Sequence, residues 1–190
     1  MFSEIKLDQL KPDPPTWDSV YFMSACKPSA VVILFFINEN KKPTMLFIRR
    51  STTVSSHRGQ IGFPGGRLEA GDLRPRDTAL REAHEEVGLD LSRVHVLGAV
   101  DPLPALDGSM VIPIVAVTNT SVEDLRLNYA EVAEIYMIPL DLVLESNRRE
   151  FGFNMFGCWR KSYLYDCGQI SVWGLSAEIL KLANFQASAR

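Results

Sequence analysis

The chain has 190 residues, of which 46% are hydrophobic and 23% are charged, the balance expected of one globular domain with an ordinary core. Its formal net charge of −3 and its pI of about 5.6 argue against a protein that holds nucleic acid through a general positive field. Its three cysteines form no C-x-x-C pair and show no metal-ligand spacing, which favours reduced thiols in a cytosol-like compartment.

The first residues, MFSEIKLDQLKPDPP, show no cationic stretch followed by an apolar core, so no signal peptide is expected. The longest apolar run, AVVILFFI at residues 30–37, is far shorter than the ~20 residues that cross a bilayer. We therefore expect a cytoplasmic protein without a membrane partner.

The chain begins with a polar segment that several prolines interrupt. Because proline fixes φ and removes a backbone donor, we predict that residues 1–28 form an N-terminal extension and that residues 29–190 form the domain. Residues 30–37 are apolar, β-branched and aromatic, which is typical of a strand buried on both faces. Turn-forming residues follow at 38–43, and TMLFIRR at 44–50 predicts a second strand and so a β-hairpin.

Helical and strand patterns alternate along the rest of the chain. An apolar stripe marks residues 77–87 as an amphipathic helix, and Gly88 follows as its stop. Residues 172–185 predict a second amphipathic helix, near whose start Trp173 is expected to anchor the core, and a short helix is expected at 141–146. Further strands are predicted at residues 60–63, 94–100, 110–117, 134–140 and 161–166. These elements predict one α/β domain, an α+β sandwich in which a mixed β-sheet packs between helices.

The sequence REAHEEVGL at residues 81–89 places three carboxylates close together. On a helix, Glu82, Glu85 and Glu86 fall within about 100° of arc, and like charges on one face repel each other. One interpretation is an ordinary exposed face rich in glutamate. The other is that a divalent metal binds there, with Arg81 orienting one carboxylate through a charge-assisted hydrogen bond.

The stretch GRLEAGDLRPRDTALREAHEEVGL, residues 66–89, resembles the Nudix box: G, five residues, E, seven residues, REUxEExGU, where U is aliphatic. Two positions depart from the pattern on its N-terminal side. Asp72 stands where the box has its first glutamate, and eight residues instead of seven separate it from Arg81. Ala83 is a small substitute for the aliphatic residue.

The resemblance implies the Nudix fold and the hydrolysis of a nucleoside diphosphate linked to another group. It implies that Mg²⁺ or Mn²⁺ is held by Glu82, Glu85 and Glu86 together with the carbonyl of Gly66 or Gly65. The metal would neutralise phosphate oxygens and lower the pKa of the water that attacks one phosphorus. One of these glutamates, or a carboxylate from a later loop, would accept the proton of that water.

Two further residues are assigned to catalysis. Arg81 belongs to the box, and Glu131, in the run YAEVAEIYMIPL, is the candidate for the later carboxylate. A solvated glutamate ahead of a strand is the alternative interpretation of Glu131.

The segment before the box, LFIRRSTTVSSHRGQIGFPGG at residues 46–66, resembles the signature of coenzyme A pyrophosphatases: LLTxRS, three residues, R, three residues, G, three residues, FPGG. Ile48 replaces the threonine and Ser55 replaces the second arginine. Residues 108–117 and 172–180 are similar to the same subgroup. The residues expected to bind substrate are Arg50, Ser51, His57, Arg58, Gly59 and Phe63.

The leading hypothesis is therefore cleavage of coenzyme A, or of an acyl derivative, into a 3′-phosphoadenosine nucleotide and phosphopantetheine. The same chemistry on ADP-ribose, a nucleotide sugar or a dinucleotide is the first alternative. A Nudix-fold module that binds nucleotides without catalysis is the second. The partner is a small-molecule nucleotide rather than nucleic acid, and the sequence leaves both a monomer and a homodimer open.

Overall fold

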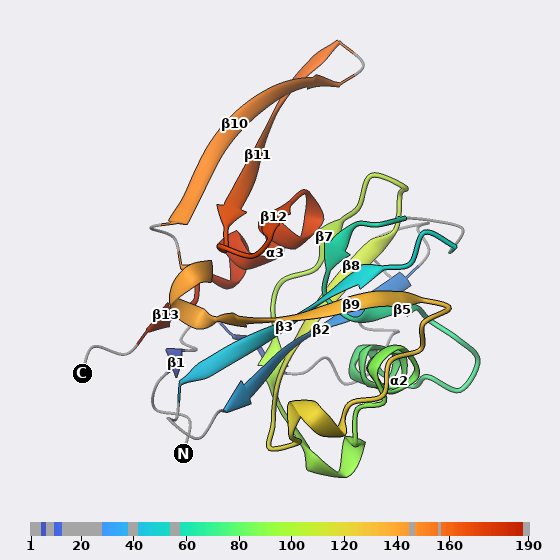
Figure 1. Ribbon diagram of the computed structural model, residues 1–190. Coiled ribbons are helices and arrows are strands. Elements are labelled where there is room, and N and C mark those ends of the chain that lie inside the picture. The colour runs from blue at the N-terminus through green and yellow to red at the C-terminus, as the bar shows by residue number, and fades with distance from the viewer. Residues whose placement is uncertain are drawn as a thin grey trace.

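The computed structural model describes residues 5–6, 10–12, 28–37, 42–53, 58–144, 147–155 and 157–187. In these residues a large sheet lies between two helices, and a smaller sheet extends from the C-terminal part of the chain (Figure 1). Across this same part of the chain, no helix is both long and apolar enough to span a membrane.

Eight strands build the large sheet. They are β2 (Pro28–Ile37), β3 (Pro43–Arg50), β4 (Ile61–Gly62), β5 (Gly65–Arg67), β6 (Val94–Ala99), β7 (Leu103–Pro104), β8 (Met110–Thr118) and β9 (Val132–Pro139). Their order is β4-β3-β2-β8-β6, with β5 on β2, β9 on β3 and β7 on β8. β2 and β8 run parallel and the other pairs run antiparallel, so the sheet is mixed, as predicted.

The predicted hairpin of β2 and β3 is confirmed, but its strands separate early. Phe35 of β2 lies opposite Met45 of β3, whereas Ala30, nearer the start of β2, lies opposite Gly66 of β5. β3 turns away to pair with β9 and β4. The sheet forks here, and the fork places β5 beside β2, in contact with the helix that carries the acidic face.

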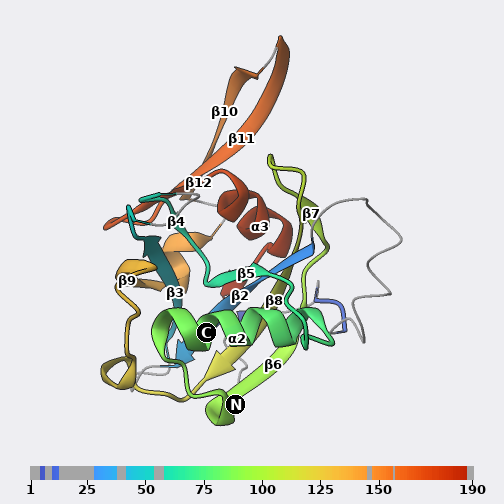
Figure 2. The same cartoon turned by 90° about the vertical axis from the view of Figure 1, so that its right-hand side faces the viewer.

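The two helices pack on opposite faces of the sheet, because alternate side chains of a strand point to opposite sides. Val32 and Leu34 of β2 pack with α2 (Pro75–Val87) on one face. Ile33 and Phe35 pack with α3 (Leu175–Ala183) on the other. Figure 2 shows β5 between the two helices. The predicted α/β sandwich is confirmed.

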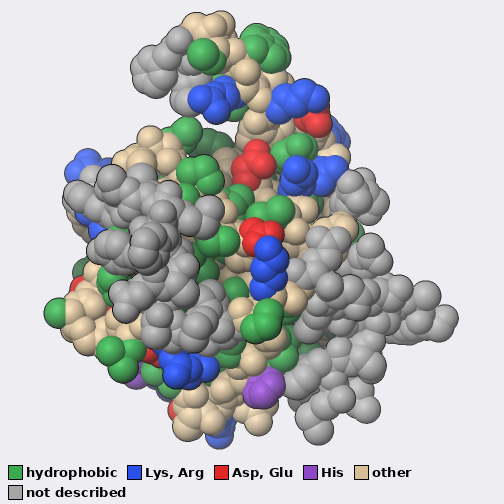
Figure 3. All heavy atoms as spheres, turned by 180° about the vertical axis from the view of Figure 1, so that it is seen from behind, with side chains coloured by type: hydrophobic (Ala, Val, Ile, Leu, Met, Phe, Trp, Pro, Cys, Tyr) green, Lys and Arg blue, Asp and Glu red, His purple; other side chains and the backbone are tan. Residues whose placement is uncertain are grey.

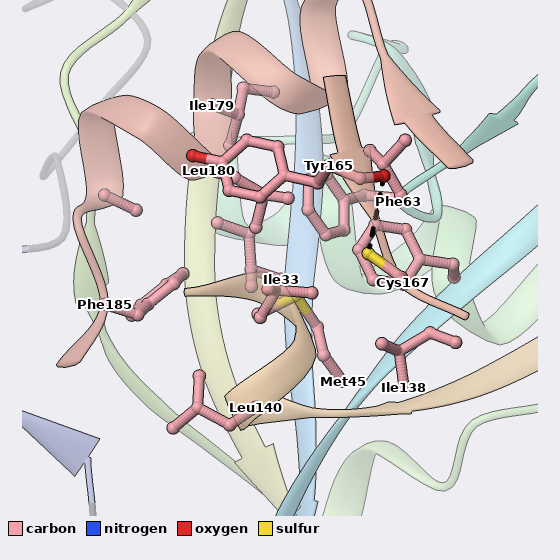
Figure 4. Packing of buried hydrophobic residues seen from close by; sticks show 14 of the residues in the cluster. Ile33, Met45, Phe63, Ile138, Leu140, Tyr165, Cys167, Ile179, Leu180 and Phe185 are labelled. Atoms are coloured by element: carbon pink, nitrogen blue, oxygen red, sulfur yellow. Dashed lines mark hydrogen bonds between the residues drawn. The ribbon is translucent and has the colours of Figure 1, made fainter. Parts of the chain in front are cut away.

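The core beneath α3 explains why residues 30–37 are apolar throughout. Ile33 and Met45 are fully buried there together with Leu180 and Phe185 from the C-terminal segment (Figure 4). Because the other face of β2 is covered by α2, this strand has no side that faces water, and every position favours an apolar residue.

A second sheet contains β10 (Arg148–Met155), β11 (Cys158–Asp166) and β12 (Ser171–Trp173). The β10–β11 hairpin projects from the body, and in the space-filling view from behind its tip carries hydrophobic and basic side chains side by side (Figures 1 and 3). The sequence predicted only residues 161–166 of it. Exposed residues such as Phe151 and Trp159 leave β10 and the first part of β11 without the alternation that marks a half-buried strand.

Several predicted boundaries were wrong by a few residues. Helix α2 begins at Pro75, and α3 begins only at Leu175 because β12 takes the residues before it. The short helix expected at 141–146 is a 3-10 turn, η3 (Leu140–Val143). The remaining short elements are β1 (Ile5–Lys6) paired with β13 (Gln186–Ala187), and the 3-10 turns η1 (Leu91–Arg93) and η2 (Val122–Asp124).

Candidate active site

Helix α2 begins and ends where local sequence dictates. Pro75 stands in its first turn, where a missing N–H costs no hydrogen bond, and the Asp77 carboxylate accepts a hydrogen bond from the Arg74 N–H (2.9 Å). Gly88 ends the helix in the left-handed conformation, with φ at 67°. A side chain there would meet the backbone of Arg126 at 2.9 Å, so glycine lets the loop after β8 approach the helix end.

Glu86 is the buried member of the acidic face. Its side chain is 0% exposed, and its Oε2 accepts a hydrogen bond from the Gly65 N–H at 3.0 Å. Nη1 of Arg50 lies 3.0 Å from Oε1 without the orientation of a hydrogen bond, which leaves this buried oxygen without a hydrogen-bond partner. Burial raises the pKa of Glu86 to about 7, against the lowering effect of the Arg50 charge. The Arg50 cation offsets the charge of this oxygen, but a buried oxygen without a hydrogen bond is still costly.

Glu82 lies one turn earlier, against the backbone of β5. A Cβ atom on Gly66 would come within 2.3 Å of Oε1 of Glu82, so the carboxylate occupies the space that a side chain there would need. Burial raises the pKa of Glu82, whereas the charge of Arg81 lowers it. The Gly65-Gly66 pair thus has a structural reason: the N–H of Gly65 binds one carboxylate and Gly66 makes room for another.

Arg81 connects the acidic face to the loop before the helix. Its Nη1 lies 3.0 Å from Oε2 of Glu85 and 3.1 Å from Oε1 of Glu82. Its Nη2 donates to Oδ2 of Asp72 (3.1 Å) and to the carbonyl of Arg67 (3.0 Å). Burial would lower the pKa of Arg81, but the hydrogen bond to Asp72 and the nearby carboxylates raise it. Arg81 is therefore a permanent cation between the two glutamates.

Asp72 keeps its contact with Arg81 despite the longer spacing. Its side chain is nearly buried, and Oδ2 also accepts hydrogen bonds from the Thr78 hydroxyl (2.9 Å) and the Glu69 N–H (3.0 Å). Burial would raise the pKa of Asp72, but these hydrogen bonds, the largest from Arg81, lower it. The longer spacing of the Nudix box is thus accommodated in the loop before the helix, and Asp72 still forms an ion pair with Arg81.

The acidic face has the chemistry of a divalent metal site. Among the residues that the structure describes, no three His, Cys, Asp or Glu side chains converge on one point, because Arg81 stands between Glu82 and Glu85. Carboxylate oxygens are nevertheless the ligands that Mg²⁺ and Mn²⁺ prefer, and Oε1 of Glu86 is a buried oxygen that lacks a hydrogen-bond partner. The carboxylates of Glu82, Glu85 and Glu86 fit such a metal by their chemistry, and in this structure Arg81 pairs with the first two of them.

Glu131 is brought beside the acidic face by backbone hydrogen bonds. The N–H of Asn128 donates to the carbonyl of Glu86 (3.0 Å), and the N–H of Ser51 donates to the carbonyl of Glu131 (2.7 Å). Burial is the main cause that raises the pKa of Glu86, and the charge of Glu131 adds to it. The side-chain amide of Asn128, which the sequence did not single out, donates to Oε1 of Glu131 (3.1 Å) and orients it.

A cavity of about 490 Å³ opens beside Glu82. Trp173 lines it, and this corrects the expectation that Trp173 anchors the core: its side chain is 54% exposed, because Val172 takes the buried side of β12. Arg67 and Leu106 also line the cavity, and no sequence motif had marked either of them. Of these three residues, only Trp173 could have been linked to the site from the sequence, because it lies in the segment 172–180 that resembles the coenzyme A subgroup.

Two of the residues expected to bind substrate lie on the wall of this cavity. Arg50 lines it beside Glu82 and donates from Nη2 to the carbonyl of Gly65 (2.6 Å). Phe63 lines it as well, although it is nearly buried and stacks on Phe47 with ring centroids 4.8 Å apart.

Three of the other expected substrate residues, Ser51, Arg58 and Gly59, lie away from the cavity. Ser51 is buried and its backbone holds the Glu131 loop, while Gly59, with φ at 67°, donates its N–H to the carbonyl of Arg50 (3.0 Å). Arg58 is exposed, and none of these three lines the cavity. His57 falls outside the described residues, so its predicted role stays a prediction.

Solved structures with similar folds support the architecture. One is a Nudix hydrolase from M. smegmatis, RenU, with a TM-score of 0.51 and 21% identity, covering 62% of this chain and 73% of that one. Another is a MutT/nudix family protein from Enterococcus faecalis, with a TM-score of 0.52 and 16% identity, covering 87% of this chain and 66% of that one. At these identities the likeness concerns the fold alone.

Sequence relatives extend the likeness over most of the chain. The uncharacterized Nudix hydrolase NudL of Photorhabdus laumondii is 41% identical over 140 residues, 73% of this chain and 74% of that protein. The protein of the same name from Yersinia pestis is 34% identical over 187 residues, 98% of this chain and 92% of that protein. The NUDIX domain model matches residues 27–156. The chain therefore belongs to the Nudix family and is a hydrolase of the pyrophosphatase type, in a family that generally uses divalent metal ions.

Proposed function

We propose that this hydrolase cleaves the diphosphate of coenzyme A or of an acyl derivative. One observation carries the proposal: three segments that resemble the coenzyme A subgroup, distant in sequence, line the same cavity beside Glu82. Arg50 and Phe63 come from residues 46–66, Val111 from residues 108–117, and Trp173 from residues 172–180. A wall shared by these segments is what a substrate-specific pocket requires.

The residues of the acidic face have complementary roles in this reaction. Glu82, Glu85 and Glu86 would hold Mg²⁺ or Mn²⁺ together with the carbonyl of Gly65 or Gly66. When bound, the metal supplies charge neutralisation of the diphosphate oxygens and acidifies the attacking water.

Two carboxylates are candidates for the base that accepts the proton of the attacking water. Glu131 is oriented by Asn128, while Glu85 is half exposed and pairs with Arg81. Arg50 would stabilise charge on the diphosphate because it lines the cavity beside Glu82. Arg81 keeps the glutamates in position through Asp72.

A panel of substrates tests the proposal. The protein is incubated with Mg²⁺ or Mn²⁺ and coenzyme A, acetyl-coenzyme A, ADP-ribose, a nucleotide sugar or a diadenosine polyphosphate, and the products are separated by chromatography. We expect coenzyme A or its thioester to show the highest kcat/KM and to yield adenosine 3′,5′-bisphosphate and the phosphopantetheine product. The Glu85→Gln variant, purified in parallel, measures any contaminating pyrophosphatase.

Two outcomes would contradict the coenzyme A assignment. Turnover of ADP-ribose far above that of coenzyme A would favour the first alternative, in which the substrate is ADP-ribose, a nucleotide sugar or a dinucleotide. No turnover of any compound, combined with a higher Tm in the presence of nucleotides, would indicate a module that binds without catalysis.

A further inference from the structure

We propose that Trp173 is the surface on which the nucleobase of the substrate stacks. The inference deepens the proposed function, since it requires that a nucleotide enters the cavity beside Glu82, but it does not require that the nucleotide be coenzyme A. It assigns a binding role to a residue whose sequence context suggested a core position.

The exposure of Trp173 follows from its place on a short strand. In β12, Val172 is fully buried, and Trp173 lies opposite Leu164 of β11 with its side chain on the other side of the strand. An indole that is 54% exposed leaves a large apolar surface in water, which needs a reason when the same side chain lines a cavity. Beside it, a Cβ atom on Gly174 would meet nothing within 4 Å, so there is open space for a ligand.

The lining of the cavity combines charged and apolar side chains. Glu82 and Arg50 provide charge from α2 and β3, and Arg67 and Asp107 form a second charged pair, whereas Trp173, Leu106 and Ile179 provide apolar surface. The helices α2 and α3 lie on opposite faces of the sheet, with β5 between them in Figure 2, and both contribute residues to the lining of the cavity: Glu82 from α2 and Ile179 from α3. A nucleoside diphosphate has the same combination, with charge at the diphosphate and a flat apolar surface at the base.

The flat shape of the indole favours contact with the nucleobase of coenzyme A over contact with its pantetheine arm. An aromatic side chain stacks on the planar face of a base, and such a contact contributes about 1–3 kcal/mol, or roughly a tenfold to hundredfold change in affinity. The pantetheine arm is a flexible chain of amides and methylene groups without a planar ring. A base on Trp173 and the diphosphate at Glu82 would use both the apolar and the charged side chains at once.

Binding of adenosine monophosphate to the metal-free protein tests the inference without catalysis. We expect Trp173→Ala and Trp173→Leu to bind AMP at least about tenfold more weakly than the wild type, and Trp173→Phe to stay within about threefold of it. Leucine keeps apolar volume but removes the aromatic face, so it separates stacking from packing. Adenosine 3′,5′-bisphosphate is measured as a second probe, and thermal unfolding checks that each variant is folded.

Trp159→Ala is the matched control, because Trp159 is 71% exposed on the β10–β11 hairpin and does not line the cavity. Its affinity for AMP should equal that of the wild type. AMP should quench tryptophan fluorescence in the wild type and in Trp159→Ala, and this quenching should disappear in Trp173→Phe although the nucleotide still binds.

The outcomes separate this inference from the choice of substrate. AMP is common to coenzyme A, ADP-ribose and diadenosine compounds, so failure to hydrolyse coenzyme A leaves the binding test valid. Equal affinity of the wild type and Trp173→Leu for AMP would overturn the inference even if coenzyme A is hydrolysed. It would also be overturned if neither adenosine probe binds the wild type.

Discussion

Replacing Glu85 with glutamine should lower kcat/KM by roughly 100- to 10,000-fold while the protein stays folded. Glutamine keeps the shape of the side chain but removes the charge that a metal or a proton would use. Glu85 is 47% exposed, and its ion pair is with Arg81, which retains Glu82 and Asp72 as partners. Because exposed ion pairs contribute little, the free energy of unfolding should change by less than about 1 kcal/mol.

Glu150→Gln is the matched control for this experiment. Glu150 is 49% exposed and pairs with Lys161 at 2.7 Å, so it has nearly the same exposure and the same kind of contact as Glu85, but it lies on the projecting hairpin. Steady-state kinetics and urea unfolding of both variants provide the comparison. Unchanged turnover in Glu85→Gln would remove this carboxylate from the reaction.

Substituting alanine for Gly66 should lower turnover about 100-fold or more with little loss of stability. The new Cβ would lie 2.3 Å from Oε1 and 2.7 Å from Oε2 of Glu82, so the carboxylate must move away from its place against β5. The clash is with the end of a flexible side chain, and the φ of Gly66 is not positive, so the backbone accepts alanine. A displacement of about 1 Å in a catalytic group can cost about two orders of magnitude in rate.

Gly65→Ala is the informative comparison, because we expect it to lower the stability of the protein, whereas Gly66→Ala should lower its activity. Gly65 has φ at 152°, and a Cβ there would lie 2.4 Å from the carbonyl oxygen of Ala30, which is backbone and cannot rotate aside. We expect it to lose about 2 kcal/mol or more of unfolding free energy. Thermal unfolding and kcat measured on both variants separate the two effects. A Gly66→Ala enzyme as active as the wild type would show that the position of Glu82 does not matter.

The central strands and the acidic helix could be predicted because buried positions show a regular pattern of apolar residues in the sequence. Residues 30–37 are apolar at every position since both faces of β2 are covered, and the stripe of α2 repeats at helical spacing because one face packs on the sheet. The β10 strand left no such pattern because its residues are largely exposed. Its existence depends on pairing with β11, a tertiary contact that local sequence does not encode.

The site was only partly predictable for a related reason. The spacing of Glu82, Glu85 and Glu86 places them on one face, but nothing in that spacing says that Glu86 is fully buried against Arg50 while Glu85 is half exposed. That difference arises because the fork in the sheet sets β5 and the end of β3 over one side of the helix. Trp173 was misplaced because an aromatic residue next to an apolar helix usually enters the core, and only the alternation within β12 turns it toward the cavity.

We propose that the acidic face of α2 is the metal site of this hydrolase. The most direct test is a titration of the protein with Mn²⁺, in which the electron paramagnetic resonance signal of the free ion reports the bound fraction. We predict that the wild type binds Mn²⁺ and that Glu85→Gln binds it at least about tenfold more weakly. The control variant Glu150→Gln should bind Mn²⁺ with the affinity of the wild type. Equal binding of Mn²⁺ by the wild type and Glu85→Gln would contradict the claim.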